Sequence, residues 1–547
     1  MMQAYDFTWI FGLGMVFAFM DAYGIGANDV SNAFATSISS GSLTLIQASI
    51  IACFTEFLGA LLLGSSTSET IKGGILSVSR FVDQPEMLML AMLCAVFGSA
   101  VWVILASKNG WPVSTTHSIV GAICGVGIAG FGGGSLKWEW GGISSIITSW
   151  FLSPIAAGIV SAILYTITKY SVLRRADSFK WGLRTVPAYF FFTAAINAFY
   201  IIYKGAPGTN AAKLSVGTIV GISFGIGAVF ALFSWFFFVP WVTRRVKGHE
   251  DLRWYHVFII PVLSKRPTLQ QADTEMHAPT AAAAAISTPS SSPDDIIDEK
   301  IKTKEDLAES LESSQQDTDA GLNEISAPPK SKFSQYKTKA INAAMHGLRQ
   351  DVRNLDSDHL KEVHAAAILY DDDAEYLFSF LQILTACMAS FAHGSNDVAN
   401  AVGPLASIFD TWQTATVDVA GKVPVPIWIL AYGGVAIDIG LLTLGYRVMR
   451  KMGNNITYFT PSRGFCAELG AALTVLTCSK LGLPVSTTHC ITGATAGVGL
   501  CNGNWRAINW KMLGWCFFSW ILTLPAAGLM AGLLFAFGSN APNFIRS

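Results

Sequence analysis

Charge is scarce in this sequence. Only 13% of its 547 residues are Asp, Glu, Lys or Arg, whereas a soluble protein has roughly 25%. The net charge of −1 excludes an electrostatic nucleic-acid binder, which needs a basic surface, so no nucleic-acid partner is expected. With 52% hydrophobic residues and a mean hydropathy of +0.44, the composition argues against a water-soluble globular enzyme and indicates an integral membrane protein.

Other absences narrow the class further. No Lys or Arg precedes Lys72, so the N-terminus lacks the basic region of a signal peptide and the arginines of a transit peptide. The nine cysteines lie in apolar stretches without zinc-ligand spacing, which predicts neither disulfides nor a zinc site. Neither a Walker A motif nor a hydrolase pattern is present, so we expect no enzyme, no ATP-driven transport and no enzymatic cofactor.

Long apolar runs are what the sequence does contain. They predict an all-α integral membrane protein with about twelve transmembrane segments, because each run approaches the length needed to cross a bilayer. The predicted segments cover residues 7–39, 43–66, 87–106, 112–130, 143–168, 186–203, 215–240, 376–408, 425–449, 465–480, 484–500 and 511–537.

A polar insert, residues 242–375, interrupts the apolar runs. It holds 39 of the 73 charged residues, and its composition predicts a long, largely disordered central loop. The loop is either a plain linker or a site for regulatory kinases or partner proteins. The positive-inside rule places this loop and the basic link 169–184 in the cytoplasm, and both termini outside the cell.

Two motifs occur twice. The run Gly26–Ala33 recurs with one alanine-to-serine and one serine-to-alanine difference at Gly394–Ala401, an offset of 368, and Pro112–His117 recurs unchanged at Pro484–His489, an offset of 372. Seven predicted segments separate the starts of the two copies, so the copies face opposite sides of the membrane. Such inverted-topology repeats are typical of secondary transporters. The predicted organisation is a first repeat (1–170), two connecting segments (171–241), the cytoplasmic loop (242–375) and a second repeat (376–547).

Six acidic residues lie inside apolar segments. No Lys or Arg lies deep in any predicted segment to pair with them, and each charge at the bilayer centre costs at least about 2.5–3.5 kcal/mol. We therefore expect protons or metal cations to neutralise them, which indicates a cation-coupled transporter. These residues are Asp21, Asp29, Glu56, Asp397, Asp438 and Glu468.

The Asn-Asp pairs predict broken helices. Gly26 precedes Asn28 and Asp29, Gly394 precedes Asn396 and Asp397, and glycine allows a helix to open there. Opened carbonyls together with carboxylate and amide oxygens would form a sodium-type cation site. Ordinary capping at a helix kink is the alternative interpretation.

The Pro-Val-Ser-Thr-Thr-His motifs predict helix starts with clustered hydroxyls. Free N–H groups and the helix dipole favour an anion there, and two such starts could surround one tetrahedral oxyanion. The alternative is Ser/Thr packing between membrane helices. For His117 and His489 we leave open binding, proton shuttling and a hydrogen bond to a neighbouring segment, and the roles of Asp21 and Asp438 are also open. The candidate ligands for this oxyanion are Ser114, Thr115, Thr116, Ser486, Thr487 and Thr488.

These duplicated motifs resemble the inorganic phosphate transporter (PiT) family. The arrangement around the long loop is similar to the eukaryotic sodium–phosphate symporters of that family, especially the fungal high-affinity type. The resemblance implies sodium-coupled uptake of inorganic phosphate across the plasma membrane, for which we expect alternating access. It also implies that the six hydroxyl residues and the carboxylates of Asp29 and Asp397 bind phosphate. The residues implied in sodium binding or coupling are Asn28, Asp29, Glu56, Asn396, Asp397 and Glu468.

Several alternatives stay open. The same fold could carry phosphate with protons, or carry sulfate, although sulfate has no proton to donate to a carboxylate at pH 7. A phosphate sensor or receptor would suit the long insert. A homodimer is compatible with the sequence, which does not determine the stoichiometry, the affinity or the oligomeric state.

Overall fold

The computed structural model describes residues 2–73, 75–140, 142–204, 214–268, 358–419, 425–481, 483 and 485–540. Within this part of the chain the regular structure is helical, with two isolated β-bridges and no strand, which confirms the predicted all-α class. Residues 269–357, which include most of the predicted loop, lie outside the described residues.

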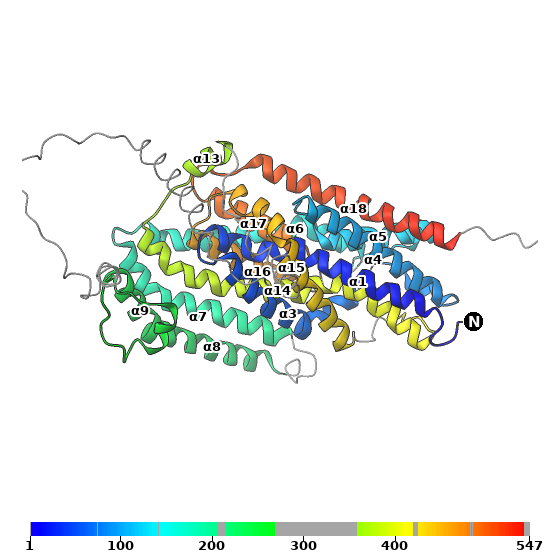
Figure 1. Cartoon of the computed structure of the whole chain (residues 1–547), viewed down its shortest axis with the longest axis horizontal. Coiled ribbons are helices and arrows are strands. Elements are labelled where there is room, and N and C mark those ends of the chain that lie inside the picture. The colour runs from blue at the N-terminus through cyan, green and yellow to red at the C-terminus, as the bar shows by residue number, and fades with distance from the viewer. Residues whose placement is uncertain are drawn as a thin grey trace, which may run out of the picture.

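Long helices form nearly all of the bundle (Figure 1). In chain order they are α1 (Thr8–Asn28), α2 (Val30–Ser39), α3 (Leu45–Gly73), α4 (Pro85–Lys108), α5 (Thr115–Phe131), α6 (Ile143–Thr168), α7 (Ser178–Lys204), α8 (Val216–Phe233), α9 (Val239–Val246), α13 (Asp358–Ala365), α14 (Asp372–Thr414), α15 (Ile427–Ile456), α16 (Pro461–Lys480), α17 (Thr487–Leu500) and α18 (Trp510–Ser539).

Each predicted segment overlaps a helix, but the helices differ in length. Among the described residues, nine spans are long and apolar enough to cross a membrane. Helices α5 and α17 have 17 and 14 residues, roughly 25 and 21 Å, which is shorter than a hydrocarbon core of about 30 Å. Twelve crossings therefore stay a prediction, and the two helices that follow the duplicated proline motifs are short.

Helix contacts in the first half recur in the second. Helix α1 packs against α15 as α14 packs against α3, and α1 contacts α4 as α14 contacts α16. Helix α5 packs along α18, and α17 packs along α6 in the same way. Because most of these pairs join one half to the other, the two halves are interleaved rather than placed side by side.

The glycines of the Asn-Asp motifs allow this interleaving. A Cβ atom on Gly26 would lie 1.8 Å from the carbonyl oxygen of Ile437, and one on Gly394 would lie 2.3 Å from that of Glu56. Both distances are far inside van der Waals contact. Helix α1 therefore touches the backbone of α15, and α14 touches the backbone of α3, at the level of the paired acids. Small residues commonly permit such close helix approach in membranes.

The predicted helix opening is wrong for the second motif and slight for the first. Helix α14 continues without interruption through Asn396 and Asp397. Asp29 separates α1 from α2, yet its φ of −91° and ψ of −31° stay in the right-handed helical region, and its side chain makes no cap hydrogen bond. The motif glycines are used for close packing instead of opening, so backbone carbonyls do not turn toward a cation site there.

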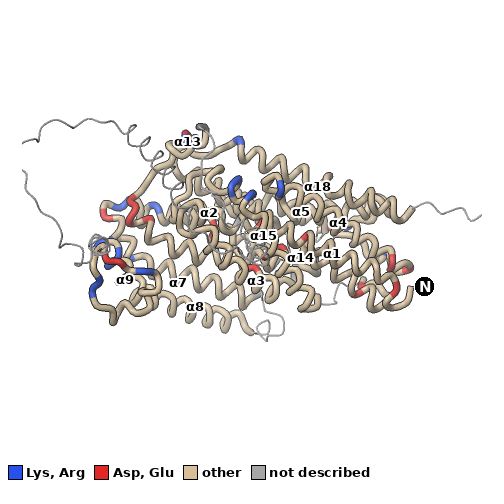
Figure 2. Tube along the Cα trace, in the orientation of Figure 1, with Lys and Arg blue, Asp and Glu red and all other residues tan. Residues whose placement is uncertain are grey.

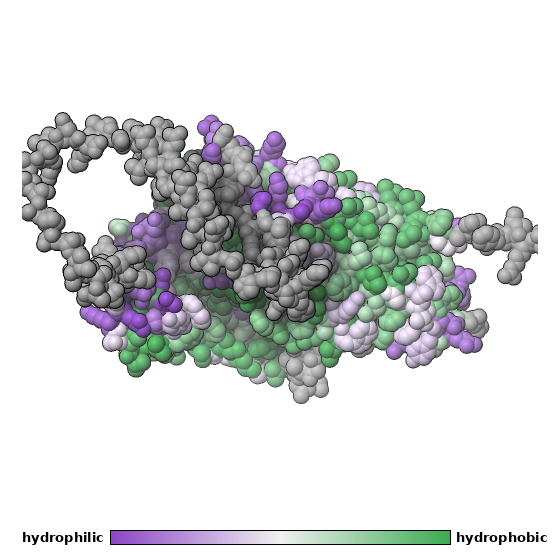
Figure 3. Space-filling view, in the orientation of Figure 1, coloured by the Kyte–Doolittle hydropathy of each residue, from purple (hydrophilic) through white to green (hydrophobic). Residues whose placement is uncertain are grey.

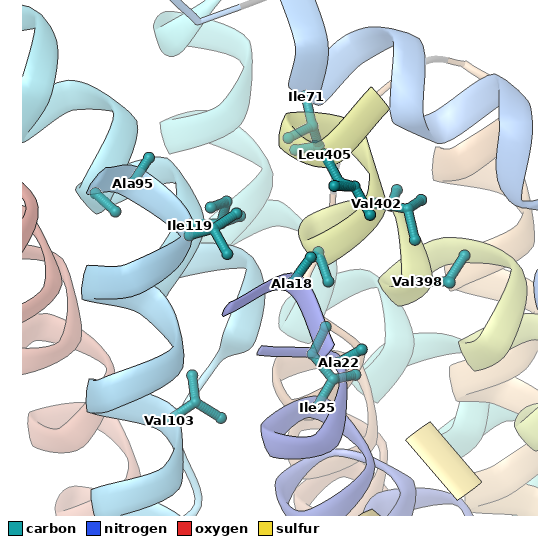
Figure 4. Close-up of a cluster of buried hydrophobic side chains, with 14 of the residues drawn as sticks. Ala18, Ala22, Ile25, Ile71, Ala95, Val103, Ile119, Val398, Val402 and Leu405 are labelled. Atoms are coloured by element: carbon teal, nitrogen blue, oxygen red, sulfur yellow. The ribbon is translucent and has the colours of Figure 1, made fainter. Parts of the chain in front are cut away.

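The hydrophobic core is built by helices from both halves. Figure 4 shows side chains of α1, α3, α4, α5 and α14 converging in one cluster. The labelled residues are Ala18, Ala22, Ile25, Ile71, Ala95, Val103, Ile119, Val398, Val402 and Leu405.

The outer surface is apolar along the bundle, as a lipid environment requires. Large side chains of α6, α8 and α18 are exposed, among them Ile159, Val229 and Phe537. Figure 3 shows this hydrophobic surface as green regions along the bundle, with hydrophilic residues toward the left, the top and the lower right of the view. An exposed apolar area of this extent marks a surface that faces another apolar phase.

The ends of the molecule differ in charge. The N-terminus and the end of α18 lie at the same end, and α9 and α13, which flank residues 269–357 on either side, lie toward the opposite end (Figure 1). In Figure 2, Lys and Arg gather near α9, where acidic segments also lie, and on the upper side near α13 and α18, whereas the end with the N-terminus shows acidic segments alone.

Gly26→Ala is expected to destabilise the fold by about 1–3 kcal/mol or more, because the added methyl group overpacks the contact with Ile437. Thermal unfolding of the purified protein in detergent measures the effect. Gly12→Ala is the control on the same helix, since nothing lies within 4 Å of a Cβ there. Equal unfolding temperatures for the two variants would contradict the packing role of Gly26.

Candidate functional site

Two helix starts face the centre of the bundle. Ser114 caps α5, where its hydroxyl accepts a hydrogen bond from the N–H of His117 at 3.2 Å. Ser486 caps α17 and accepts from the N–H of His489 at 3.3 Å. These caps confirm the predicted helix starts. The helix begins three residues after Pro112, however, rather than at the proline.

Asp29 joins the two helix starts. Its carboxylate accepts a hydrogen bond from the Thr115 hydroxyl at 2.6 Å and another from the Thr488 hydroxyl at 3.0 Å. Thr115 begins α5 and Thr488 lies in the first turn of α17, so one buried carboxylate contacts both copies of the hydroxyl motif. The Thr488 hydroxyl also lies 3.3 Å from the carbonyl oxygen of Val113.

Asp397 occupies the corresponding place in the second half. It accepts a hydrogen bond from the Thr487 hydroxyl and one from the Asn396 amide, both at 2.7 Å. The Nε2 atom of His393 lies 2.9 Å from the same carboxylate. Asp29, His393 and Asp397 offer ligand atoms that all lie within 4.8 Å of one another, so the two acids share one buried site.

The asparagines hold the chain that leads into each helix start. Asn28 donates to the Trp111 carbonyl at 2.9 Å and accepts from the Val113 N–H at 3.1 Å. Asn396 donates to the Val485 carbonyl at 3.0 Å. The Oδ1 atom of Asn396 is buried and has no hydrogen-bond partner among the described residues, so it is free to bind a cation.

Asn400 links the halves a second time, and sequence reasoning did not select it. Its amide lies 3.3 Å from the hydroxyls of both Thr115 and Thr116. The signal that could have identified it is its position in the duplicated motif, where it corresponds to Asn32. The Thr116 hydroxyl also lies 3.4 Å from the Val485 carbonyl. Of the four candidate threonines, only Thr487 makes no hydrogen bond to the other half of the chain among the described contacts.

His393 corrects the expectation that the intramembrane acids have only protons or metal cations as partners. Its Nδ1 atom lies 2.6 Å from the Glu56 carboxylate, and its Nε2 atom faces Asp397. Ser390 donates to Glu56 at 2.7 Å. An imidazolium donates from both nitrogens, so this histidine can neutralise part of the charge. Its spacing of four residues before Asp397 was the available signal in the sequence.

Glu468 belongs to a different hydrogen-bond cluster. Its carboxylate accepts hydrogen bonds from four side chains of α2 and α14 and is fully buried. The structure thus brings Asp29, Asp397 and Glu56 together through His393 and gives Glu468 its own polar setting. The donors to Glu468 are Thr36, Ser37, Gln382 and Thr385.

Asp21 and Asp438 lie apart from the duplicated motifs. Asp21 is fully buried, and neither of its carboxylate oxygens has a hydrogen-bond partner in the described part of the chain. Asp438 is half-buried, on α15. Within the described part of the chain, neither makes a hydrogen bond to the site around Asp29.

The helical fold, the apolar surface and the buried polar site define a multi-pass membrane transporter. Residues 25–531 match the model of the phosphate transporter family, and the chain belongs to that family. The predicted resemblance is thereby confirmed.

Named relatives agree with this assignment. The chain is 37% identical to the phosphate-repressible phosphate permease pho-4 of Neurospora crassa, over 99% of each chain. It is 31% identical to the mouse sodium-dependent phosphate transporter 1, over 97% of this chain and 95% of the relative. A solved structure of a sodium-dependent phosphate transporter superposes with a TM-score of 0.66 and 27% identity, covering 98% of this chain and 100% of that one. These relatives are named as transporters or permeases, not as enzymes.

Replacing His393 with alanine is expected to destabilise the protein by about 3–5 kcal/mol, because Glu56 and Asp397 lose their buried partner. In the double variant Glu56→Gln/His393→Ala the loss is smaller, since one of the two unpaired charges is gone. Thermal unfolding in detergent compares the variants, with the exposed His359→Ala on α13 as a control expected within about 0.5 kcal/mol of wild type. A double variant no more stable than His393→Ala would refute the pairing.

Proposed function

We propose that this protein is a sodium-coupled symporter of inorganic phosphate that works by alternating access. Family membership supports phosphate transport. The Neurospora relative is named a phosphate permease, and the mouse relative and the solved structure are named sodium-dependent phosphate transporters. The proposal rests on one structural observation: threonine hydroxyls at the starts of both α5 and α17 donate hydrogen bonds to the Asp29 carboxylate.

The proposed phosphate site lies between the starts of α5 and α17. The first N–H groups of a helix have no partner within the helix and favour an anion. Six hydroxyl groups lie at these starts, and Asp29 and Asp397 accept hydrogen bonds. Phosphate retains protons at pH 7, so it can donate to a carboxylate while it accepts from hydroxyls. The proposed ligands are Asp29, Ser114, Thr115, Thr116, Asp397, Ser486, Thr487 and Thr488.

Sodium would offset the remaining negative charge. Two carboxylates share one buried site with a single histidine, so binding an anion there requires further positive charge. We propose sodium ligands at Asn28, Asp29, Asn396 and Asp397, with the free Oδ1 of Asn396 as the best-placed amide oxygen. Asn28 Oδ1 already accepts from Val113 and would have to share or release that bond.

Glu56 and Glu468 are proposed to couple ion binding to conformation. Glu56 reaches the site through His393, which lies between it and Asp397. Glu468 accepts from Thr36 and Ser37 of α2, the short helix that directly follows Asp29. Movement of α2 would therefore change the contacts of both Asp29 and Glu468.

Alternating access is proposed to use two inverted repeats, 1–170 and 376–547, joined by residues 171–241 and the loop 242–375. The recurrence of helix contacts in the two halves supports the repeat, and repeats of this kind are typical of alternating-access transporters. Twelve crossings and a homodimer are part of this proposal.

The proposed location is the plasma membrane, with both termini outside and the central loop, open to kinases or partner proteins, in the cytoplasm. The common end of the N-terminus and α18, and the basic residues near α9 and α13, support this orientation. Epitope tags at the two termini should bind antibody on intact cells, whereas a tag within residues 269–357 should bind only after permeabilisation. The reverse pattern would overturn the orientation.

Uptake of radiolabelled phosphate into vesicles tests the function. We expect Asp29→Asn and Asp397→Asn each to lower uptake by more than about tenfold, because each loses a charge-assisted hydrogen bond in a buried site. Asp21→Asn, an isosteric change of a buried acid on the same helix, is the control and should stay near wild type.

Ion replacement separates the alternatives in the same assay. Replacing sodium with potassium or choline should abolish uptake. Undiminished uptake without sodium, accompanied by a dependence on the proton gradient, would establish proton coupling instead. Competition by excess sulfate would identify a sulfate carrier, and phosphate binding without uptake would identify a sensor.

A further inference from the structure

Four aromatic side chains form a row of ring contacts between the two halves, and the two histidines among them directly follow threonines of the site in the chain. They are His117 of α5, Trp150 of α6, His489 of α17 and Trp520 of α18. The ring centroids of His117 and Trp150 lie 4.1 Å apart, those of His489 and Trp520 lie 3.8 Å apart, and the two histidines lie 4.5 Å from each other.

Each histidine also bonds to the backbone of the other half. The Nδ1 atom of His489 lies 3.2 Å from the Trp150 carbonyl, and that of His117 lies 3.4 Å from the Trp520 carbonyl. A carbonyl only accepts, so Nδ1 carries the proton in both bonds and each histidine is the donor.

The two bonds are chemically unequal because of a proline. Pro154 lies inside α6 and has no N–H, so the helix cannot satisfy the carbonyl four residues earlier, which belongs to Trp150. His489 supplies the missing donor. In α18 the corresponding Pro525 removes the partner of Ile521 and not of Trp520, so the bond of His117 fills no such gap.

The ring nitrogens show that these histidines do not serve as packing alone. The Nε2 atoms of His117 and His489 and the indole nitrogens of Trp150 and Trp520 are buried without a hydrogen-bond partner in the described part of the chain. Leaving such groups unpaired is unfavourable, and apolar rings would fill the space without that penalty. An apolar ring could fill the same space, but it could not donate the Nδ1 hydrogen bonds. These bonds are therefore the reason for histidine at both positions.

We propose that His489, with His117 as its weaker counterpart, is a positioning residue for the anion site. His489 directly follows Thr488, whose hydroxyl holds Asp29, and His117 directly follows Thr116, which lies against Asn400. The bond from His489 to Trp150 sets where α17 begins relative to the first half, and so where Thr488 meets Asp29. This inference rests on the proposed phosphate transport.

The test uses the difference between asparagine and glutamine. The Asn Nδ2 atom takes the place of imidazole Nδ1, whereas the Gln Nε2 atom takes the place of imidazole Nε2. We expect His489→Gln to raise the KM for phosphate about tenfold, as a buried carbonyl is left unpaired. His489→Asn should keep KM within about twofold, and the maximal rate should change less than KM in both variants.

A second change checks the role of the proline. Pro154→Ala restores an N–H that can bond the Trp150 carbonyl within α6, but it does not restore the bond from α17 to α6. The unfolding temperature of His489→Ala should therefore recover in the double variant, while its KM should stay raised. The unfolding temperature of His117→Ala should not recover, because that variant leaves a different carbonyl. Thermal unfolding in detergent is measured alongside to separate loss of fold from loss of affinity.

The outcomes distinguish this inference from the proposed function. Equal KM values for the Asn and Gln variants, or a wild-type KM in the double variant Pro154→Ala/His489→Ala, would overturn the positioning role. Uptake by the wild-type protein would still leave the proposed function standing. Variants that unfold earlier yet keep the wild-type KM would show a purely structural ring. Absence of phosphate uptake by the wild-type protein would overturn the proposed function and this inference with it.

Discussion

Burial of negative charge is the constraint on which the rest of this structure depends. Asp29 and Asp397 lie in one site inside a bundle with an apolar outer surface, where an unpaired carboxylate is strongly unfavourable. Every described element of the site reduces that penalty. Threonine hydroxyls from two helix starts donate to the acids, and His393 lies between Asp397 and Glu56. Two carboxylates beside one histidine leave negative charge that a bound cation would offset, as the proposed sodium coupling requires.

Close helix contact makes this arrangement attainable. Gly26 and Gly394 bring α1 and α14 onto the backbones of α15 and α3 at the level of the acids. The short helices α5 and α17 then begin at the same depth, held by Asn28 and Asn396 through the carbonyls that precede them. A bundle with longer separations would leave the acids bonded only within their own half. The polar site therefore depends on the close helix approach that these glycines permit.

Periodic and compositional features made much of this predictable. The all-α class, the location of each apolar helix and the presence of a helix start at each proline motif follow from local sequence, because they depend on hydrophobicity and on the residues that begin helices. The exact start, at the serine caps and not at the prolines, was not predicted. The broken helices predicted at the Asn-Asp motifs did not agree with the structure, in which α14 is continuous and the break at Asp29 is slight. Glycine is compatible both with an opened helix and with close packing, and only the neighbouring backbone of Ile437 or Glu56 decides between them. The role of Asn400 could not be predicted from the sequence either, because its partners Thr115 and Thr116 lie in the other half of the chain.

The sequence by itself determined that the chain is a membrane protein, that its motifs are duplicated, and that acids and hydroxyls form the candidate site, since composition and repetition are local properties. Tertiary structure decided which of these groups meet. His393 acquires its importance from Glu56, a residue more than three hundred positions away, and His489 from a carbonyl that Pro154 leaves unbonded on α6. Such pairings depend on how the two halves interleave, and no local pattern records the distance between atoms of different helices.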